Sequence, residues 1–203
     1  MNLPNKLSLT RIILVPVFMC LYLMDFIPYG KLIAAAVFIL AALTDMWDGQ
    51  IARKHNLITD LGKLLDPIAD KMLLLGGLLV IMADGIMLIE FLIVIAFLVV
   101  ARDHLVNSYR QIGASKGVIF AAVFSGKIKS IILYIAIIMA MALGGIYQAN
   151  FFSGLALDIC TYATYGMLAL GGIFTVYSAI DYTIKNKAVL ASKNEKADGK
   201  AKD

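Results

Sequence analysis

Long apolar runs separated by short polar segments dominate this chain from its beginning to about residue 184. A membrane-spanning helix needs about 20 predominantly apolar residues, and each run is long enough to cross the hydrocarbon core. The runs do not alternate apolar and polar positions, as the strands of a membrane barrel would, so helices are expected. The six predicted helices cover residues 7–24, 32–52, 64–82, 86–111, 118–143 and 162–184.

The composition supports the same interpretation. Hydrophobic residues make up 61% of the 203 residues and charged residues 16%, whereas a soluble domain usually carries about 25% charge. These proportions exclude a soluble domain, a disordered chain, a collagen and a secreted disulfide scaffold. Cys20 and Cys160 lie far apart and have neither metal-ligand nor redox spacing. The sequence therefore predicts an all-α, polytopic integral membrane protein with six transmembrane helices.

The net charge of +4 comes mostly from the C-terminal segment, because residues 183–203 hold six lysines and three acidic residues. This distribution gives no reason to expect a nucleic-acid partner. We divide the chain into a transmembrane domain, residues 1–184, and a Lys-rich tail, residues 185–203, which we expect to be mobile.

Basic residues outside the tail gather at one set of predicted helix ends: Lys6, Arg11, Arg53, Lys54, Lys63, Arg110 and Lys116. Cytoplasmic loops of membrane proteins carry an excess of Lys and Arg. We therefore expect these ends, both chain termini and the tail to be cytoplasmic.

Four aspartates interrupt the apolar pattern at the end of the second predicted helix and the start of the third. Asp45 and Asp48 are three residues apart, and Asp66 and Asp70 are four apart, so each pair projects from one helix face. The connecting loop is short, which makes the two helices antiparallel neighbours and brings the four carboxylates together. Hard divalent cations such as Mg²⁺ suit an all-carboxylate site, and four ligands are enough for two metal ions.

Small and basic residues accompany these aspartates. Gly49, Ala52 and Gly62 leave room for a ligand beside the helices, and Arg53 could bind a phosphate bidentately. Singly, each feature also has a structural explanation: an Asp48–Arg53 ion pair, a helix start at Asp66-Pro67, or helix packing at Gly49. Together, at this spacing, they favour a functional site.

The spacing D-x2-D-G-x2-A-R-x8-G-x3-D-x3-D resembles the motif of the CDP-alcohol phosphotransferase family, and all its fixed positions match here. The matching residues are Asp45, Asp48, Gly49, Ala52, Arg53, Gly62, Asp66 and Asp70. The family transfers a phosphoalcohol or phosphatidyl group from a CDP-linked donor to an alcohol and releases CMP. The resemblance implies that the four aspartates bind two divalent cations, Mg²⁺ or Mn²⁺, and that Asp70 is also the catalytic base.

The resemblance also implies a set of residues around the CDP part of the donor: Asn5, Ser8, Asp48, Gly49, Ala52, Arg53, Thr59 and Gly62. Residues 4–11 resemble the P-N-x-L-T-x-x-R opening of the phosphatidylglycerophosphate synthases of bacteria, with Ser8 in place of threonine. For Asn5 and Ser8 the alternative is a helix cap in a polar interfacial segment.

Two further stretches resemble the same synthases and imply a binding site for the phosphate of glycerol 3-phosphate. Ala101-Arg102-Asp103 with Arg110 resembles an A-R-E...R stretch, and residues 126–130 resemble G-K-x-K-T. The candidate residues are Arg102, Arg110, Lys127 and Lys129. The two lysines are about 200° apart around a helix, so at most one should face the acceptor. Arg102 could instead pair with Asp103.

We therefore expect a phosphatidyl transfer from CDP-diacylglycerol to glycerol 3-phosphate. The resemblance places it at the cytoplasmic face of a bacterial plasma membrane, and the family is often homodimeric. One alternative is a sibling enzyme with another acceptor: inositol phosphate, serine or phosphatidylglycerol. Alternatives from other classes are a divalent-cation transporter that uses the same carboxylates and a non-catalytic membrane scaffold.

Overall fold

The computed structural model describes residues 3–54, 60–115, 124–151 and 153–191; the side chains of residues 3–4, 45–54, 60, 63, 124 and 187–191 also lie outside the description. Over these residues the chain forms helices only. They are α1 (Leu3–Leu23), α2 (Gly30–Lys54), α3 (Asp60–Asp84), α4 (Ile89–Ser115), α5 (Phe124–Ala149) and α6 (Leu155–Ala191). The predicted all-α class is confirmed.

Membrane character is confirmed as well. Within the described residues, three stretches are long and apolar enough to cross a membrane: Asn5–Leu23, Ser125–Ala149 and Leu155–Asn186. Large apolar side chains are exposed along the helices, among them Phe97 and Ile173, as expected for surfaces that face lipid. That all six helices cross the membrane stays a prediction.

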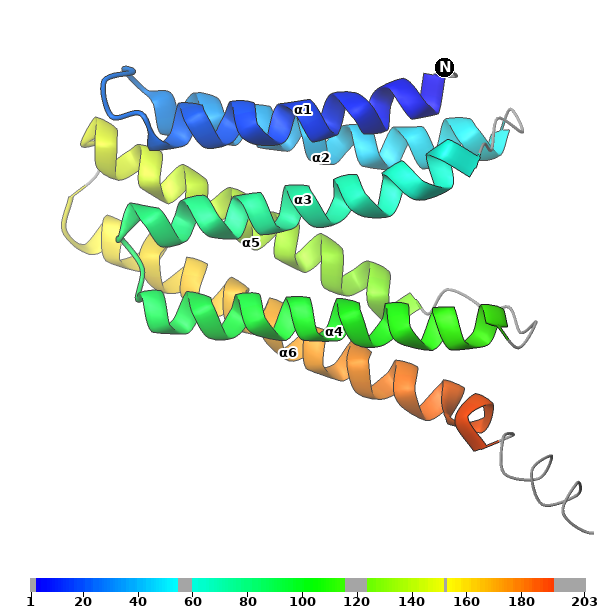
Figure 1. The fold of residues 1–203 in the computed structure, drawn as a ribbon. Helices are drawn as coiled ribbons and strands as arrows, with labels where there is room; N and C mark the ends of the chain where they lie inside the picture. Colours follow the sequence, from blue (N-terminus) through cyan, green and yellow to red (C-terminus); the bar gives the residue numbers. More distant parts are fainter. Residues whose placement is uncertain (1–2, 55–59, 116–123, 152, 192–203) are drawn as a thin grey trace, which may run out of the picture.

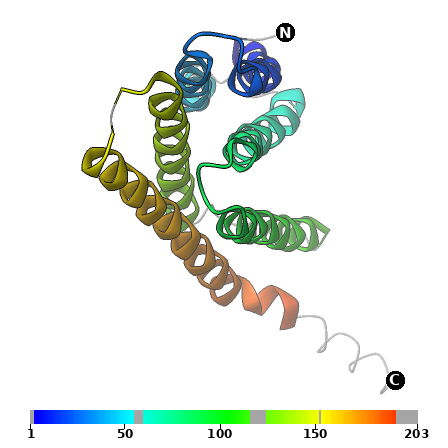
Figure 2. The same cartoon turned by 90° about the vertical axis from the view of Figure 1, so that its left-hand side faces the viewer.

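Successive helices run in opposite directions along the bundle (Figure 1). Helix α1 packs against α2 and α3, α5 packs against α2, α3 and α6, and α4 packs mainly against α6. Figure 2 shows α5 and α6 on one side of the bundle, facing α3 and α4. Because the directions alternate, the first turns of α1, α3 and α5 lie at the same end as the last turns of α2, α4 and α6.

Two helix boundaries differ from the sequence prediction in an informative way. Helix α6 continues past the predicted end at residue 184, where the Asn186 side chain donates a hydrogen bond to the Tyr182 carbonyl at 2.7 Å. Helix α3 begins at Asp60 and contains Pro67 in its interior, so Asp66-Pro67 does not mark a helix start. Because proline has no N–H, one helical hydrogen bond is lost there, and α3 bends near its beginning (Figure 1).

Aromatic rings form the centre of the core. Phe18 of α1 and Phe38 of α2 are fully buried, and their rings meet edge to face with centroids 5.4 Å apart. Gly77 allows α3 to approach this cluster closely. A Cβ atom at Gly77 would lie 2.6 Å from Ile137 Cγ2 and 2.8 Å from Phe38 Cε2. Glycine is therefore required at this crossing of α2, α3 and α5.

A buried ion pair lies at the end of the bundle where α2 begins and α3 ends. The Lys31 ammonium of α2 pairs with the Asp84 carboxylate of α3, and the Tyr22 hydroxyl of α1 donates to Asp84 Oδ2 at 2.8 Å. The side chains of Lys31 and Asp84 are only 14% and 6% exposed. This contact joins three helices, and each polar group in it has a partner.

Candidate functional site

The candidate residues whose helices the structure describes lie toward one end of the bundle, opposite the Lys31–Asp84 pair. They belong to the first half of α1, α3 and α5 and to the second half of α2 and α4 (Figure 1). The alternating helix directions alone explain why segments far apart in the sequence share this end.

Two carboxylates of the motif are described, and each receives a hydrogen bond from a hydroxyl group of another helix. The Ser8 hydroxyl of α1 donates to Asp66 Oδ1, and the Tyr134 hydroxyl of α5 donates to Asp70 Oδ1. Asp66 is exposed and Asp70 is half-buried. Neither carboxylate has a Lys or Arg ion-pair partner within the described part of the chain.

This arrangement fits a cation site in its chemistry. Two carboxylates that form no ion pair with a described Lys or Arg lie one turn apart on α3, and oxygen ligands of this kind suit Mg²⁺ or Mn²⁺. Among the described residues there is no cluster of three or more acidic, His or Cys side chains that could hold a metal. The side chains of Asp45 and Asp48 lie outside the described residues, so the convergence of all four aspartates stays a prediction.

The donor-binding residues of the motif are described only in part. The side chains of Asp48, Gly49, Ala52 and Arg53 lie outside the described residues, and so does the whole of Thr59. Their helix, α2, packs against α3. The structure therefore leaves this group of donor contacts as a prediction.

The first turns of α1 and α3 are described. Gly62 is buried at the start of α3. On α1, Asn5 is 4% exposed and Ser8 is fully buried, and both are already engaged with the protein. A contact of either residue with a donor nucleotide stays a prediction.

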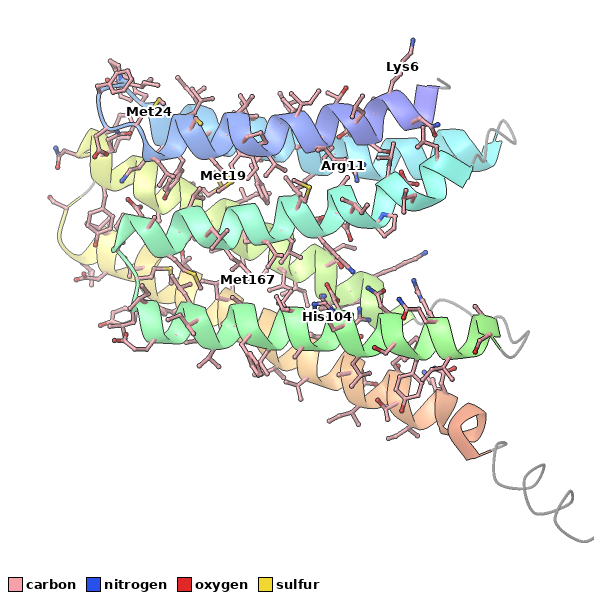
Figure 3. The ribbon with its side chains drawn as sticks, in the orientation of Figure 1. Lys6, Arg11, Met19, Met24, His104 and Met167 are labelled. Carbon is pink, nitrogen blue, oxygen red and sulfur yellow. The ribbon has the colours of Figure 1, made fainter. Side chains whose placement is uncertain are left out.

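Arg11 is a buried cation in this end of the bundle. In the sequence, Arg11 is one of the basic residues that indicate orientation and the last residue of the opening motif at residues 4–11, and its side chain is fully buried. Figure 3 shows Arg11 beneath α1, on the side of α3, whereas Lys6 points away from the bundle. An arginine is buried only when it is engaged, and Arg11 does have an interaction partner. It belongs to the interior of the site.

A basic cluster joins α4, α5 and α6 next to the carboxylates. Lys129 Nζ donates to Asp103 Oδ1 at 2.9 Å, and Arg102 Nη1 donates to the same oxygen at 3.0 Å. Arg102 Nη2 donates to Ser178 Oγ at 2.8 Å. The Lys129 ammonium also interacts electrostatically with Asp70. The Asp70 carboxylate therefore lies within electrostatic range of the basic cluster.

The structure separates the basic candidates into buried and exposed groups. Lys129 is 2% exposed, whereas Lys127 is exposed, as their spacing on a helix requires. Arg110 is exposed on α4. Arg102 pairs with Asp103, and its buried Nε has no hydrogen-bond partner within the described part of the chain. One N–H donor of the cluster is thus left for a further acceptor.

A small cavity between α3 and α4 leads to the same group of residues. Its polar lining consists of Lys71, Asp103 and His104. The rest of the lining is apolar: Leu74, Leu75, Val99 and Val100. Asp103 is also the residue that accepts hydrogen bonds from Arg102 and Lys129, so the cavity borders the basic cluster.

Sequence reasoning missed two hydroxyl groups that organise this end. Tyr134 on α5 binds Asp70, and Ser178 on α6 binds Arg102. The available signal was a polar group within an apolar run, since a buried hydroxyl needs a hydrogen-bond partner. A polar group in an apolar run predicts that a hydrogen bond exists, but it does not identify the residue at the other end of that bond.

The chain matches the sequence model of the CDP-alcohol phosphatidyltransferase family over residues 1–177. It is 34% identical to the CDP-diacylglycerol–glycerol-3-phosphate 3-phosphatidyltransferase of Bacillus subtilis, over 95% of this chain and 99% of that protein. A protein of the same name from Mycoplasma genitalium is 32% identical over 81% of this chain and 68% of its own length. Another, from Rickettsia bellii, is 40% identical over 54% of this chain and 58% of its own length.

Proposed function

Because the chain belongs to the CDP-alcohol phosphatidyltransferase family, we propose that it transfers the phosphatidyl group of CDP-diacylglycerol to glycerol 3-phosphate and releases CMP. The observation that carries this proposal is that Asp70, a half-buried carboxylate, lies within electrostatic range of the buried Lys129 ammonium. In the same basic cluster, the Arg102 Nε–H has no hydrogen-bond partner among the described residues. The carboxylate suits the acceptor hydroxyl and the cations suit the acceptor phosphate.

The metal part of the proposal rests on the carboxylates. Asp45, Asp48, Asp66 and Asp70 would hold two divalent cations, Mg²⁺ or Mn²⁺. When bound, the cations would neutralise the pyrophosphate of the donor and stabilise the CMP leaving group. The hydrogen bonds that Asp66 and Asp70 receive from the neutral hydroxyls of Ser8 and Tyr134 support this assignment, because a neutral donor does not compete with a cation.

Asp70 is assigned as the general base. It would take the proton from the acceptor hydroxyl while that oxygen forms a bond to the phosphorus that carries the diacylglycerol group. The bond that breaks joins this phosphorus to the bridging oxygen of CMP. Phosphatidylglycerophosphate and CMP are then the products, and the proton remains on Asp70 until it is released to water.

The donor would be held by the start of α1, the end of α2 and the start of α3. The assigned residues are Asn5, Ser8, Asp48, Gly49, Ala52, Arg53, Thr59 and Gly62. Arg53 would supply bidentate hydrogen bonds to a phosphate, and the small residues would let the nucleotide approach the helices.

The acceptor phosphate would bind at Arg102 and Lys129. Both are removed from solvent, which strengthens a charge-assisted hydrogen bond, and the Arg102 Nε donor has no partner in the described part of the chain. Arg110 and Lys127 are exposed and would act at longer range, in attracting the dianion. Serine lacks the phosphate and would be disfavoured.

The proposed orientation in the membrane follows from the basic residues near the candidate site. All six helices would cross the membrane, with both termini and the site on the cytoplasmic side of a bacterial plasma membrane. The acyl chains of the donor would stay in the lipid, and glycerol 3-phosphate would arrive from the cytoplasm. A homodimer is proposed on the family resemblance.

An acceptor screen tests the proposed function. Purified protein in detergent would receive CDP-diacylglycerol and Mg²⁺, and CMP release would be followed with glycerol 3-phosphate, inositol phosphate, serine and phosphatidylglycerol in separate reactions. We expect release with glycerol 3-phosphate. Release with another acceptor alone would indicate a sibling enzyme. Metal uptake into liposomes without any CMP release would indicate a transporter.

A further inference from the structure

Tyr134 is a polar residue in an otherwise apolar stretch of α5, and its hydroxyl donates to Asp70 Oδ1. Sixty-four positions separate the two residues in the sequence, so only the packing of α5 against α3 brings them together. A tyrosine hydroxyl in an apolar environment needs a partner, and here the partner is the carboxylate assigned as base and metal ligand.

The ring of Tyr134 is fixed by other aromatic rings. It packs edge to face on Phe38 of α2 with centroids 6.1 Å apart, and Phe38 packs in the same way on Phe18 of α1 at 5.4 Å. Phe38 and Phe18 are fully buried. The position of the Tyr134 hydroxyl is therefore determined by the packing of α1, α2 and α5, not by the flexible end of a long side chain.

We propose that Tyr134 is a positioning residue that fixes the orientation of the Asp70 carboxylate. Its hydrogen bond occupies Oδ1 and leaves Oδ2 for a cation or for the acceptor proton. This inference rests on the proposed function of Asp70. A hydroxyl donor that orients a ligating carboxylate typically raises metal affinity or activity by about 10–100-fold.

The second described carboxylate of the motif is held in the same way. Ser8 of α1 donates to Asp66 Oδ1. Thus both carboxylates receive a neutral O–H donor from a neighbouring helix, which orients an anion without supplying a positive charge that would compete with a cation. The opposite end of α3 shows the contrast, because there Asp84 binds both the Tyr22 hydroxyl and the Lys31 ammonium.

This contrast supplies a matched control for an experiment. Tyr134→Phe and Tyr22→Phe each remove one hydroxyl that donates to a carboxylate of α3, and each keeps the ring. Asp84 keeps its Lys31 partner in the control variant. Full-length protein in detergent would be titrated with Mn²⁺, with free Mn²⁺ measured by electron paramagnetic resonance, and kcat, the KM values and the thermal midpoint would be measured on the same samples.

We expect Tyr134→Phe to weaken Mn²⁺ binding and to lower kcat by about tenfold or more, with little change in the KM for glycerol 3-phosphate. Tyr22→Phe should leave both quantities at the wild-type value. Equal Mn²⁺ affinity and kcat in Tyr134→Phe and the wild type would overturn the inference. So would equal losses in both variants, since these would show a structural effect alone.

A second substitution covers the case in which Tyr134→Phe does not fold. Replacing Tyr134 with p-aminophenylalanine keeps an N–H donor at the same ring position, and we expect Mn²⁺ affinity within a few-fold of the wild type. A tenfold loss with this donor present would overturn the inference. Wild-type protein that releases no CMP with any acceptor would instead refute the proposed function, so the two failures are distinguishable.

Discussion

Carboxylates are rare in the apolar part of this chain, and the partners of each one indicate its role. A charged side chain deep in a membrane costs about 2.5–3.5 kcal/mol on insertion scales, so it persists only with a compensating partner or a function. Asp84 has its partner in Lys31. Asp66 and Asp70 have only hydroxyl donors within the described part of the chain. The two ends of α3 therefore carry carboxylates in different surroundings: Asp84 is paired with a cation, whereas Asp66 and Asp70 receive hydrogen bonds from neutral hydroxyls.

Asparagine substitutions separate these two kinds. Asp70→Asn removes the proposed base, and we expect the rate of CMP release to fall by at least about a hundredfold with an unchanged thermal midpoint. Asp84→Asn leaves the Lys31 ammonium buried without its anion, which typically costs about 3–5 kcal/mol. The measurements are initial rates and thermal unfolding in detergent. Normal turnover in Asp70→Asn would refute the base assignment.

The two lysines at the start of α5 form a second matched pair. Lys129 is buried beside Asp103 and Arg102, and Lys127 is exposed. A charge-assisted hydrogen bond is worth about 1.5–3 kcal/mol, so Lys129→Gln should raise the KM for glycerol 3-phosphate by about tenfold or more. Lys127→Gln should change it by less. Steady-state kinetics check this prediction, and a larger effect from Lys127→Gln would contradict it.

Whole helices are held at the correct distance by small residues. At Gly77, α3 approaches α2 and α5 so closely that a Cβ atom would overlap Phe38 and Ile137. Phe38 also supports Tyr134, so this crossing determines both the packing of the core and the position of the hydroxyl that binds Asp70. The site thus depends on a glycine about two turns beyond Asp70 on α3.

Alanine substitutions test this crossing. Gly77→Ala should destabilise the protein by about 1–3 kcal/mol, because the added methyl group overpacks the core. Gly166→Ala on α6 is the matched control, since a Cβ atom there meets no other atom within 4 Å. The control should be neutral or slightly stabilising in a helix. Chemical denaturation measures both, and equal stability of the two variants would contradict the packing argument.

The helix ends were predicted less well than the helices themselves. Apolar length predicts a helix, but it does not say where the helix stops. Helix α6 extends through a polar stretch in which Lys185 pairs with Asp181 at 2.7 Å, and α3 starts before Pro67, at Asp60. In both cases the helix continues through polar residues, which the length of an apolar run does not count.

The sequence predicts the number and the alternating directions of the helices, but it does not predict which side chains meet inside the bundle. Apolar runs joined by short loops predict alternating helices, and this alternation brings the acidic and basic motifs to one end. The partners of Tyr134 and Lys31 could not be predicted in the same way. Each joins residues more than 50 positions apart in the sequence, and only three-dimensional packing selects such pairs.

The proposed reaction requires this whole arrangement, and one measurement tests it most directly. Full-length protein would be incubated with CDP-diacylglycerol, Mg²⁺ and ¹³C-labelled glycerol 3-phosphate, and the lipid products would be identified by mass spectrometry, with Asp70→Asn in parallel. We expect ¹³C-labelled phosphatidylglycerophosphate and an equal amount of CMP from the wild type, and almost none from the variant. Consumption of CDP-diacylglycerol without a labelled lipid, or equal labelling by both proteins, would contradict it.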